Sequence, residues 1–291
     1  MSRFWKSSNG SGIGTSRLIA IAIASLVLAA TPSGTAMAQQ TTTPEVSAKQ
    51  WEGLKTDVFG NHPILLNTGV VTLNAPKRAQ DAAIVPIDIV IDPLKAGGAV
   101  KAVTLIIDMN PAPVAAKFSF GKDSGVTQLS TRVRVNDYTY MRAIAETANG
   151  ELHMSEAFIK ASGGCSAPAV KNPAEAKLTM GLMKLRQFAE KKDASMSSPA
   201  ELQLMIRHPN NSGLQMDQIT RYFIPPHFVN NLKISRDGAM VLQMEAGISI
   251  SEDPNFRFNY RPGDAKEIEA EAVDTEGLIF KDKWPVEAAG L

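Results

Sequence analysis

The chain of 291 residues has a single cysteine, Cys165, so it cannot form an internal disulfide bond. It also has almost no net charge, because 30 basic residues balance 29 acidic ones. This balance gives no electrostatic reason to expect a nucleic acid or an anionic membrane surface as a partner. Long hydrophobic runs are missing too, since the apolar stretch 18–30 is shorter than the roughly 20 residues of a membrane-spanning helix.

The N-terminal region has the features of a secretory signal peptide. Residues 1–17 contain three basic side chains and no acidic one, and the apolar stretch 18–30 follows. The small-residue sequence Ala36-Met37-Ala38 then resembles a cleavage site. We therefore expect residues 1–38 to be removed and the protein to be periplasmic. The mature chain would begin at Gln39 with a net charge of about −2.

Most of the remaining chain has the alternating pattern of β-strands. Residues 70–162 contain several short runs in which apolar and polar side chains alternate, and residues 200–291 contain a second such set. We predict an all-β fold of two immunoglobulin-like β-sandwich domains joined by a linker with a short helix, with small barrels as the alternative. The predicted segments are a signal peptide (1–38), a first sandwich ending in the cysteine (39–165), a linker (166–199) and a second sandwich (200–291).

Three local features refine this prediction. Residues 175–192 are rich in Ala, Lys, Met and Leu with helical spacing, so a short amphipathic helix is expected there, with a partly ordered linker as the alternative. Asn149-Gly150 suits the type I′ turn of a hairpin, because both of its central residues need a positive φ. Arg236-Asp237-Gly238 predicts a second tight turn between two strands.

Cys165 lies in a stretch of small residues where the strands of the first half end. Gly163 and Gly164 precede it and make the chain thin and pliable. A thiol on such a tether can enter a narrow pocket of a partner, so we expect an exposed functional thiol, with a buried structural cysteine as the alternative. The nearest basic residues are Lys160 and Lys171, and no nearby group would lower the pKa of the thiol. This predicts an attachment point for a covalent cargo, with no catalytic residue.

The four histidines show no metal-binding spacing. None of His62, His153, His208 and His227 belongs to an H-x-H or H-E-x-x-H pattern, so no metal site is predicted. His208 and His227 lie at loop boundaries, where we expect hydrogen-bonded structural or interface residues.

Several of these stretches resemble the two halves of the SoxYZ sulfur carrier. Residues 159–165, I-K-A-S-G-G-C, resemble the end of SoxY. Residues 206–209 (I-R-H-P), 224–230 (I-P-P-H-F-V-N) and 251–256 (S-E-D-P-N-F) resemble SoxZ. The order is Y then Z, and the most similar subgroup is the fused SoxYZ-like carriers associated with quinoprotein (pyrroloquinoline quinone) alcohol dehydrogenases.

The resemblance implies two immunoglobulin-like domains and a swinging arm. Cys165 would hold sulfur intermediates covalently, Gly163 and Gly164 would make the arm flexible, and no cofactor besides the cargo would be needed. Partners would be periplasmic redox enzymes that load and process the cargo, including a quinoprotein alcohol dehydrogenase system. Unlike the Gly-Gly-Cys-Gly-Gly end of SoxY, the motif continues into Ser166 and Ala167, so the tether is held at both ends.

Two other functions stay open from the sequence. A non-covalent accessory module of a periplasmic quinoprotein dehydrogenase system would need no reactive thiol. A thiol enzyme acting alone, such as a sulfurtransferase, is the least favoured, because no activating group neighbours Cys165 in the sequence.

Overall fold

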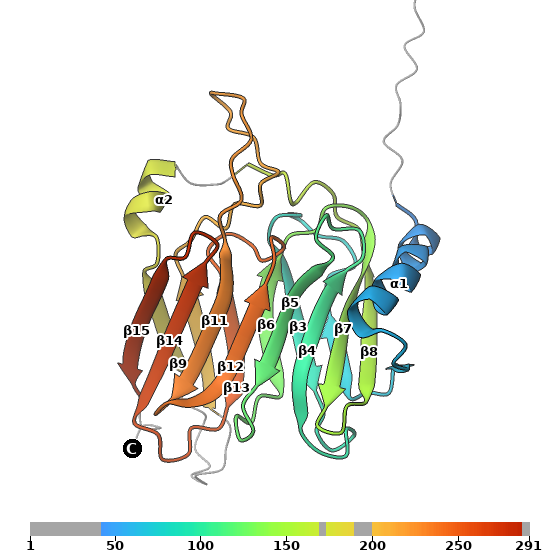
Figure 1. Cartoon of the computed structure of the whole chain (residues 1–291), viewed down its shortest axis with the longest axis vertical. Helices are drawn as coiled ribbons and strands as arrows, with labels where there is room; N and C mark the ends of the chain where they lie inside the picture. The colour runs from blue at the N-terminus through green and yellow to red at the C-terminus, as the bar shows by residue number, and fades with distance from the viewer. Residues whose placement is uncertain (1–41, 169–172, 189–199, 287–291) are drawn as a thin grey trace, which may run out of the picture. The chain divides into compact units, whose positions relative to one another are not determined.

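The computed structural model describes residues 42–168, 173–188 and 200–286, and β-strands are their main regular structure (Figure 1). The predicted signal peptide lies outside these residues. Within the described ranges, the first half contains α1 (Pro44–Phe59), β1 (Ile64–Leu66), β2 (Val71–Asn74), β3 (Val85–Ile91), β4 (Val100–Ile107), β5 (Val114–Phe120), β6 (Gln128–Val133), β7 (Thr139–Thr147) and β8 (Leu152–Ile159). The second half contains α2 (Pro173–Thr179), β9 (Met183–Phe188), β10 (Ala200–Ile206), β11 (Val229–Arg236), β12 (Ala239–Ala246), β13 (Asn255–Tyr260), β14 (Glu267–Asp274) and β15 (Ile279–Pro285).

The described strands form two sheets. One has nine strands in the order β1-β8-β7-β4-β5-β12-β11-β14-β15, and the other has six in the order β2-β3-β6-β13-β10-β9. Strands such as β3 and β14 alternate buried or less exposed side chains with more exposed ones, as the two-residue period of a strand requires. The prediction of an all-β fold is confirmed.

The two halves of the chain join edge to edge in both sheets. In the nine-stranded sheet β5 pairs antiparallel with β12, with Phe118 opposite Met244. In the six-stranded sheet β6 pairs with β13, with Leu129 opposite Phe258. Side chains from both halves belong to one core cluster, in which the rings of Phe118 and Phe256 meet edge to face at 6.4 Å. The halves therefore share a hydrophobic core, while the domain boundaries given above stay a prediction.

Helix α1 packs on the first half, and no element was predicted there. Thr43 caps its N-terminus by accepting a hydrogen bond from the Val46 amide, and Gly60 ends it at a φ of 63°. Ser47 donates to Asp108 at 3.0 Å, and the guanidinium of Arg142 lies 4.7 Å from the centre of the Trp51 ring. Only Ser47 and Trp51 are buried along the helix, so its hydrophobic periodicity is too weak to be seen in the sequence.

The helix expected over residues 175–192 was wrong in its length within the described residues, outside which residues 189–192 lie. The short α2 ends at Thr179, and Gly181 has a φ of 84°, which an α-helix cannot accommodate. The chain then forms β9, whose Leu185 lies opposite Leu204 of β10. Pairing with β10 thus overrides the helical spacing of the leucines.

Both predicted tight turns connect strands. A hairpin joins β7 to β8 at Asn149-Gly150, but only Gly150 has a positive φ, so the predicted type I′ geometry was wrong. Asp237 and Gly238 both have a positive φ, at 42° and 79°, and connect β11 to β12. Among the described residues no helix is both long and apolar enough to cross a lipid bilayer.

Candidate functional site

The segment that carries Cys165 follows β8 and is held against the first half by backbone hydrogen bonds. The amide of Gly163 donates to Asn136 O at 2.8 Å, and the amide of Gly164 donates to Val135 O at 2.9 Å. Both acceptors lie just after β6 of the six-stranded sheet, so these bonds attach the segment after β8 to the other sheet.

The two glycines before Cys165 have different structural roles. Gly163 has a φ of 77° with open space around it, so it supplies a conformation that other residues reach at a cost. Gly164 is packed so tightly that a Cβ atom would lie 2.0 Å from Ala82 O and 2.6 Å from Val135 O. Gly164 therefore permits a close backbone approach, and the arm flexibility predicted for both glycines stays a prediction.

Cys165 is completely buried, with an exposed fraction of 0%. The expectation of an exposed thiol was wrong. A long loop of the second half, residues 207–228, packs over the segment. Its Ser212 donates a short hydrogen bond to Cys165 O, and its Gln215 donates to Ala167 O at 3.0 Å. These contacts join positions 47 and 48 residues apart, so sequence patterns could not reveal them. We call residues 207–228 the covering loop.

The thiol lies in a buried environment with one positive neighbour. Burial raises the pKa of Cys165 to about 11, and the attraction of the Arg134 guanidinium offsets part of that increase. The thiol is therefore protonated at neutral pH and is a poor nucleophile as it stands. The role of Cys165 as an attachment point for a cargo stays a prediction.

Arg134 links the thiol to the second half, and the sequence analysis missed it. Its side chain is buried and donates to Ile250 O at 2.8 Å and to Ile248 O at 3.4 Å. Asn210 of the covering loop donates to the same Ile250 O at 3.3 Å. Residues of both halves thus form the surroundings of Cys165.

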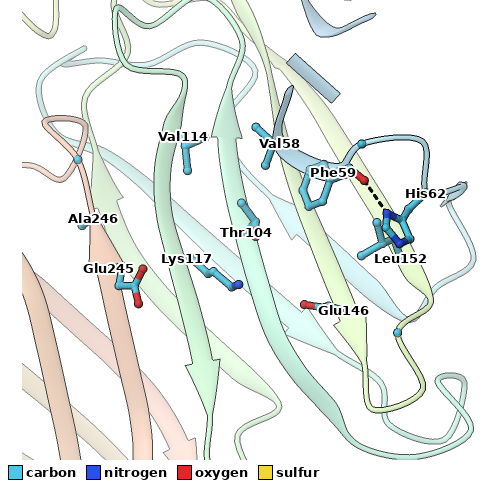
Figure 2. Close-up of a pocket in the computed structure, with 13 residues that line it drawn as sticks. Val58, Phe59, His62, Thr104, Val114, Lys117, Glu146, Leu152, Glu245 and Ala246 are labelled. Carbon is cyan, nitrogen blue, oxygen red and sulfur yellow. Dashed lines mark hydrogen bonds between the residues drawn. The ribbon is translucent and has the colours of Figure 1, made fainter. Parts of the chain in front are cut away.

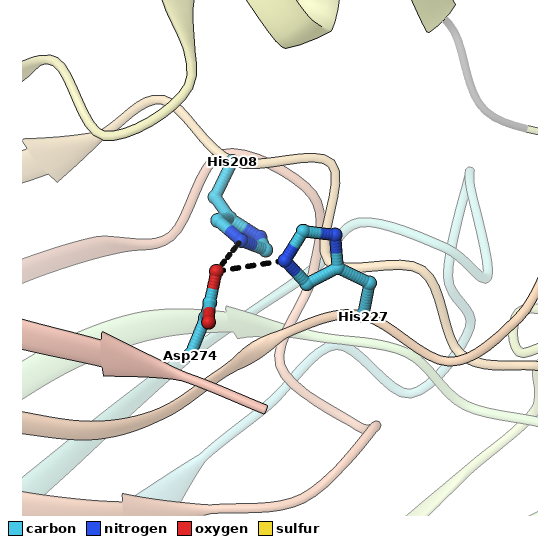
Figure 3. Close-up of side chains that lie close together, drawn as sticks. All are labelled: His208, His227 and Asp274. Atoms are coloured by element: carbon cyan, nitrogen blue, oxygen red, sulfur yellow. Dashed lines mark hydrogen bonds and ion pairs between the residues drawn. The ribbon is translucent and has the colours of Figure 1, made fainter. Parts of the chain in front are cut away.

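The histidines predicted as interface residues form a cluster in the second half, together with Asp274 (Figure 3). The Nε2 atom of His227 lies 2.7 Å from Asp274 Oδ2, and that of His208 lies 3.5 Å from the same oxygen. Burial, and after it the neighbouring His227, lowers the pKa of His208. Asp274 comes 47 residues after His227 and at the end of β14, so no local motif could have identified it.

The cluster lies beside a cavity of about 460 Å³. Among the described residues, its lining includes the acidic Asp217, Glu252 and Glu276 together with His227 and Lys177. Whether His208 and His227 contact a partner protein stays a prediction.

The other two histidines lie elsewhere. His153 is buried in β8, where its Nδ1 lies 2.9 Å from Thr68 Oγ1. His62 is exposed, with its Nδ1 2.7 Å from Phe59 O, and it lines a groove of about 790 Å³ beside α1 (Figure 2). The groove lies over β4, β5 and β12, where Lys117 is flanked by Glu146 and Glu245 (Figure 2). Its ionisable groups come from separate strands and show no arrangement typical of catalysis.

Comparisons with known proteins agree on both halves of the chain. The family model of "Sulfur oxidation protein SoxY" matches residues 55–165, and that of "Sulphur oxidation protein SoxZ" matches residues 188–285. The SoxY match ends at Cys165 itself. A search of curated protein sequences found no match.

Two solved structures are similar to parts of the chain. The sulfur carrier protein SoxY from Chlorobium limicola f thiosulfatophilum is 20% identical over 40% of this chain and 94% of its own, with a TM-score of 0.33. A beta-glycosidase from Bacteroides vulgatus is 13% identical over 78% of this chain and 25% of its own, with a TM-score of 0.22. Because the two family matches together span most of the residues, in the order Y then Z, the chain is a fused SoxYZ-like protein of the sulfur carrier families.

Proposed function

We propose that this protein is a periplasmic covalent carrier in which Cys165 holds a small sulfur-containing group and presents it to partner enzymes. The observation that carries the proposal is that the single thiol of the chain ends the SoxY match and is enclosed by residues of both halves. The signal-peptide pattern of residues 1–38 supports export. In this proposal the protein itself performs no catalysis.

The surroundings of Cys165 suit storage of a cargo between reactions. A buried adduct is protected from water and from other thiols. The Arg134 guanidinium lies close enough to affect the pKa of the thiol, and it would stabilise a negatively charged sulfur group attached there. Loading and unloading then require the covering loop to move away, since no reagent reaches a fully buried sulfur atom.

Partner enzymes would supply the redox chemistry. A thiol with a pKa of about 11 does not ionise readily, so loading depends on an enzyme that opens the site and accepts the proton. We propose periplasmic redox enzymes for this role, including those of a quinoprotein alcohol dehydrogenase system.

One observation favours a second function. The complete burial and raised pKa of Cys165 also suit a structural cysteine in a non-covalent accessory module of a quinoprotein dehydrogenase system. Substitution in the native host distinguishes the two functions. A host lacking the gene is complemented with the wild-type protein, Cys165→Ser or Cys165→Ala, each checked for equal abundance. The carrier function predicts that both variants fail to restore sulfur-dependent growth, and full restoration by either would support the accessory module.

A further inference from the structure

Three side chains from separate segments of the second half bring nitrogen and oxygen atoms that could bind a metal ion close together (Figure 3). His208 follows β10, His227 precedes β11 and Asp274 ends β14. Each offers one possible metal-ligand atom, and these atoms all lie within 4.8 Å of one another. The side chains of His208 and Asp274 are completely buried, and that of His227 is 13% exposed.

The hydrogen bonds around Asp274 leave one of its oxygens for the imidazoles. Its Oδ1 accepts the amides of Glu276 and Leu278, both at 2.9 Å. These bonds fix the carboxylate so that Oδ2 faces His227 and His208. On the far side of the His227 ring, Nδ1 lies 3.5 Å from Glu276 Oε1. At this distance Glu276 is an ion-pair neighbour of the ring, on the side where a metal-binding histidine usually has a supporting acceptor.

His208 provides an independent sign that the cluster is incomplete. Its Nε2 is buried and has no hydrogen-bond partner among the described residues, because Asp274 Oδ2 at 3.5 Å is too far for a good hydrogen bond. A buried polar nitrogen without a partner is costly and requires an explanation. A metal ion between the three side chains would provide one.

We propose that His208, His227 and Asp274 bind a divalent transition-metal ion of the Zn²⁺ or Fe²⁺ type. Two imidazoles and one carboxylate suit these ions, whereas Ca²⁺ and Mg²⁺ prefer sites made of oxygen atoms. Three protein ligands leave a coordination position open. His227 lines the cavity of about 460 Å³, so the cluster lies next to a route by which an ion could enter. Among the described lining residues, the carboxylates of Asp217, Glu252 and Glu276 outnumber Lys177, which favours the entry of a cation.

Metal binding requires a proton of His208 to move. The amide of Asn210 donates to His208 Nδ1 at 3.0 Å, so in the metal-free protein the neutral ring carries its proton on Nε2. When Nε2 binds the metal, the proton belongs on Nδ1, and the Asn210 amide loses its acceptor. Asn210 lies two residues before Ser212, which holds the segment of Cys165. Metal binding would therefore change the hydrogen bonding of Asn210, near the start of the covering loop.

Zn²⁺ binding to the full mature chain tests the site. The experiments use a Cys165→Ala background, so that the thiol does not contribute, and measure affinity by competition with a chromophoric chelator. We expect one ion per chain, at least tenfold weaker binding in His227→Gln and roughly tenfold weaker binding in Glu276→Gln. The matched control, His62→Gln, removes an exposed histidine outside the cluster and should bind Zn²⁺ as the background protein does.

Two spectroscopic and exchange measurements then identify the ligands. Co²⁺ in place of Zn²⁺ should give visible absorption bands that His227→Gln changes and His62→Gln does not. Amide hydrogen exchange at Asn210 should accelerate when Zn²⁺ binds. Absence of stoichiometric Zn²⁺ binding, equal affinity in His227→Gln, or unchanged exchange at Asn210 in the Zn²⁺-bound protein would each overturn the proposal. His227 and Glu276 are partly or largely exposed, so their variants report on binding even if His208→Gln fails to fold.

Discussion

Cys165 should react far more slowly in the folded protein than in the unfolded chain. At pH 7.5 a thiol with a pKa of about 11 is ionised roughly 300-fold less than an ordinary cysteine with a pKa near 8.5. The greater intrinsic nucleophilicity of the more basic thiolate recovers about tenfold. The net effect of the pKa is a rate about 30-fold lower, and the need to move the covering loop lowers the rate further.

The assay follows the reaction of Cys165 with a small disulfide reagent, in buffer and in concentrated urea. Ser212→Ala removes the hydrogen bond from the covering loop to Cys165 O. Loss of about 1 kcal/mol should raise the rate of the folded protein by roughly fivefold. Ser166→Ala is the matched control. Within the described part of the chain, the exposed Ser166 hydroxyl donates a hydrogen bond only to Gly163 O, at 3.2 Å, and not to the covering loop. This control should leave the rate nearly unchanged.

Two results would refute this reasoning. A folded-state rate within about threefold of the rate in urea would mean that burial and the raised pKa do not protect the thiol. Equal rates for Ser212→Ala and Ser166→Ala would mean that the covering loop does not control access to Cys165.

Three further predictions rest on the raised pKa of Cys165, the shared hydrophobic core and the tight packing of Gly164. The folded thiol keeps its proton up to a pH of about 11, whereas the unfolded one loses it near 8.5. The free energy of unfolding should therefore fall by about 1.4 kcal/mol per pH unit across this window, and Cys165→Ala should abolish this part of the slope in urea titrations. Because both halves share one core, single-tryptophan variants that keep Trp51 or Trp284 should report the same urea midpoint, and midpoints that differ would contradict a shared core. Gly164→Ala would place a methyl group 2.0 Å from Ala82 O, so it should lower the melting temperature and speed the labelling of Cys165; a wild-type melting curve would show that this backbone approach is not rigid.

The sequence was sufficient for the features that depend on neighbouring residues. The alternation of side chains predicted the all-β fold, and Asp237-Gly238 marked a turn because few other pairs adopt two positive φ angles. The helix predicted over 175–192 was wrong for two reasons. Gly181 adopts a positive φ, and Leu185 pairs with Leu204 of a strand that lies beyond the apparent linker. Local periodicity cannot report such a partner.

The surroundings of Cys165 could not be predicted from the sequence for the same reason. Ser212 and Gln215 of the covering loop hydrogen-bond to the segment that carries Cys165. They are close to it because the two halves of the chain are joined by strand pairing in both sheets. Likewise, Asp274 meets His227 only through the pairing of β14 with β11. Composition identified the thiol, since it is the only one, while its environment required the fold.

The most direct test of the carrier function is the mass of the intact protein purified from the periplasm of its own host, with and without a phosphine reductant. Peptide mapping then locates any adduct. The account predicts a reductant-labile adduct on the peptide that contains Cys165, with a mass that identifies the cargo, and none on Cys165→Ser. A bare thiol under every growth condition, or only a disulfide-linked dimer, would contradict the carrier function and favour the accessory module.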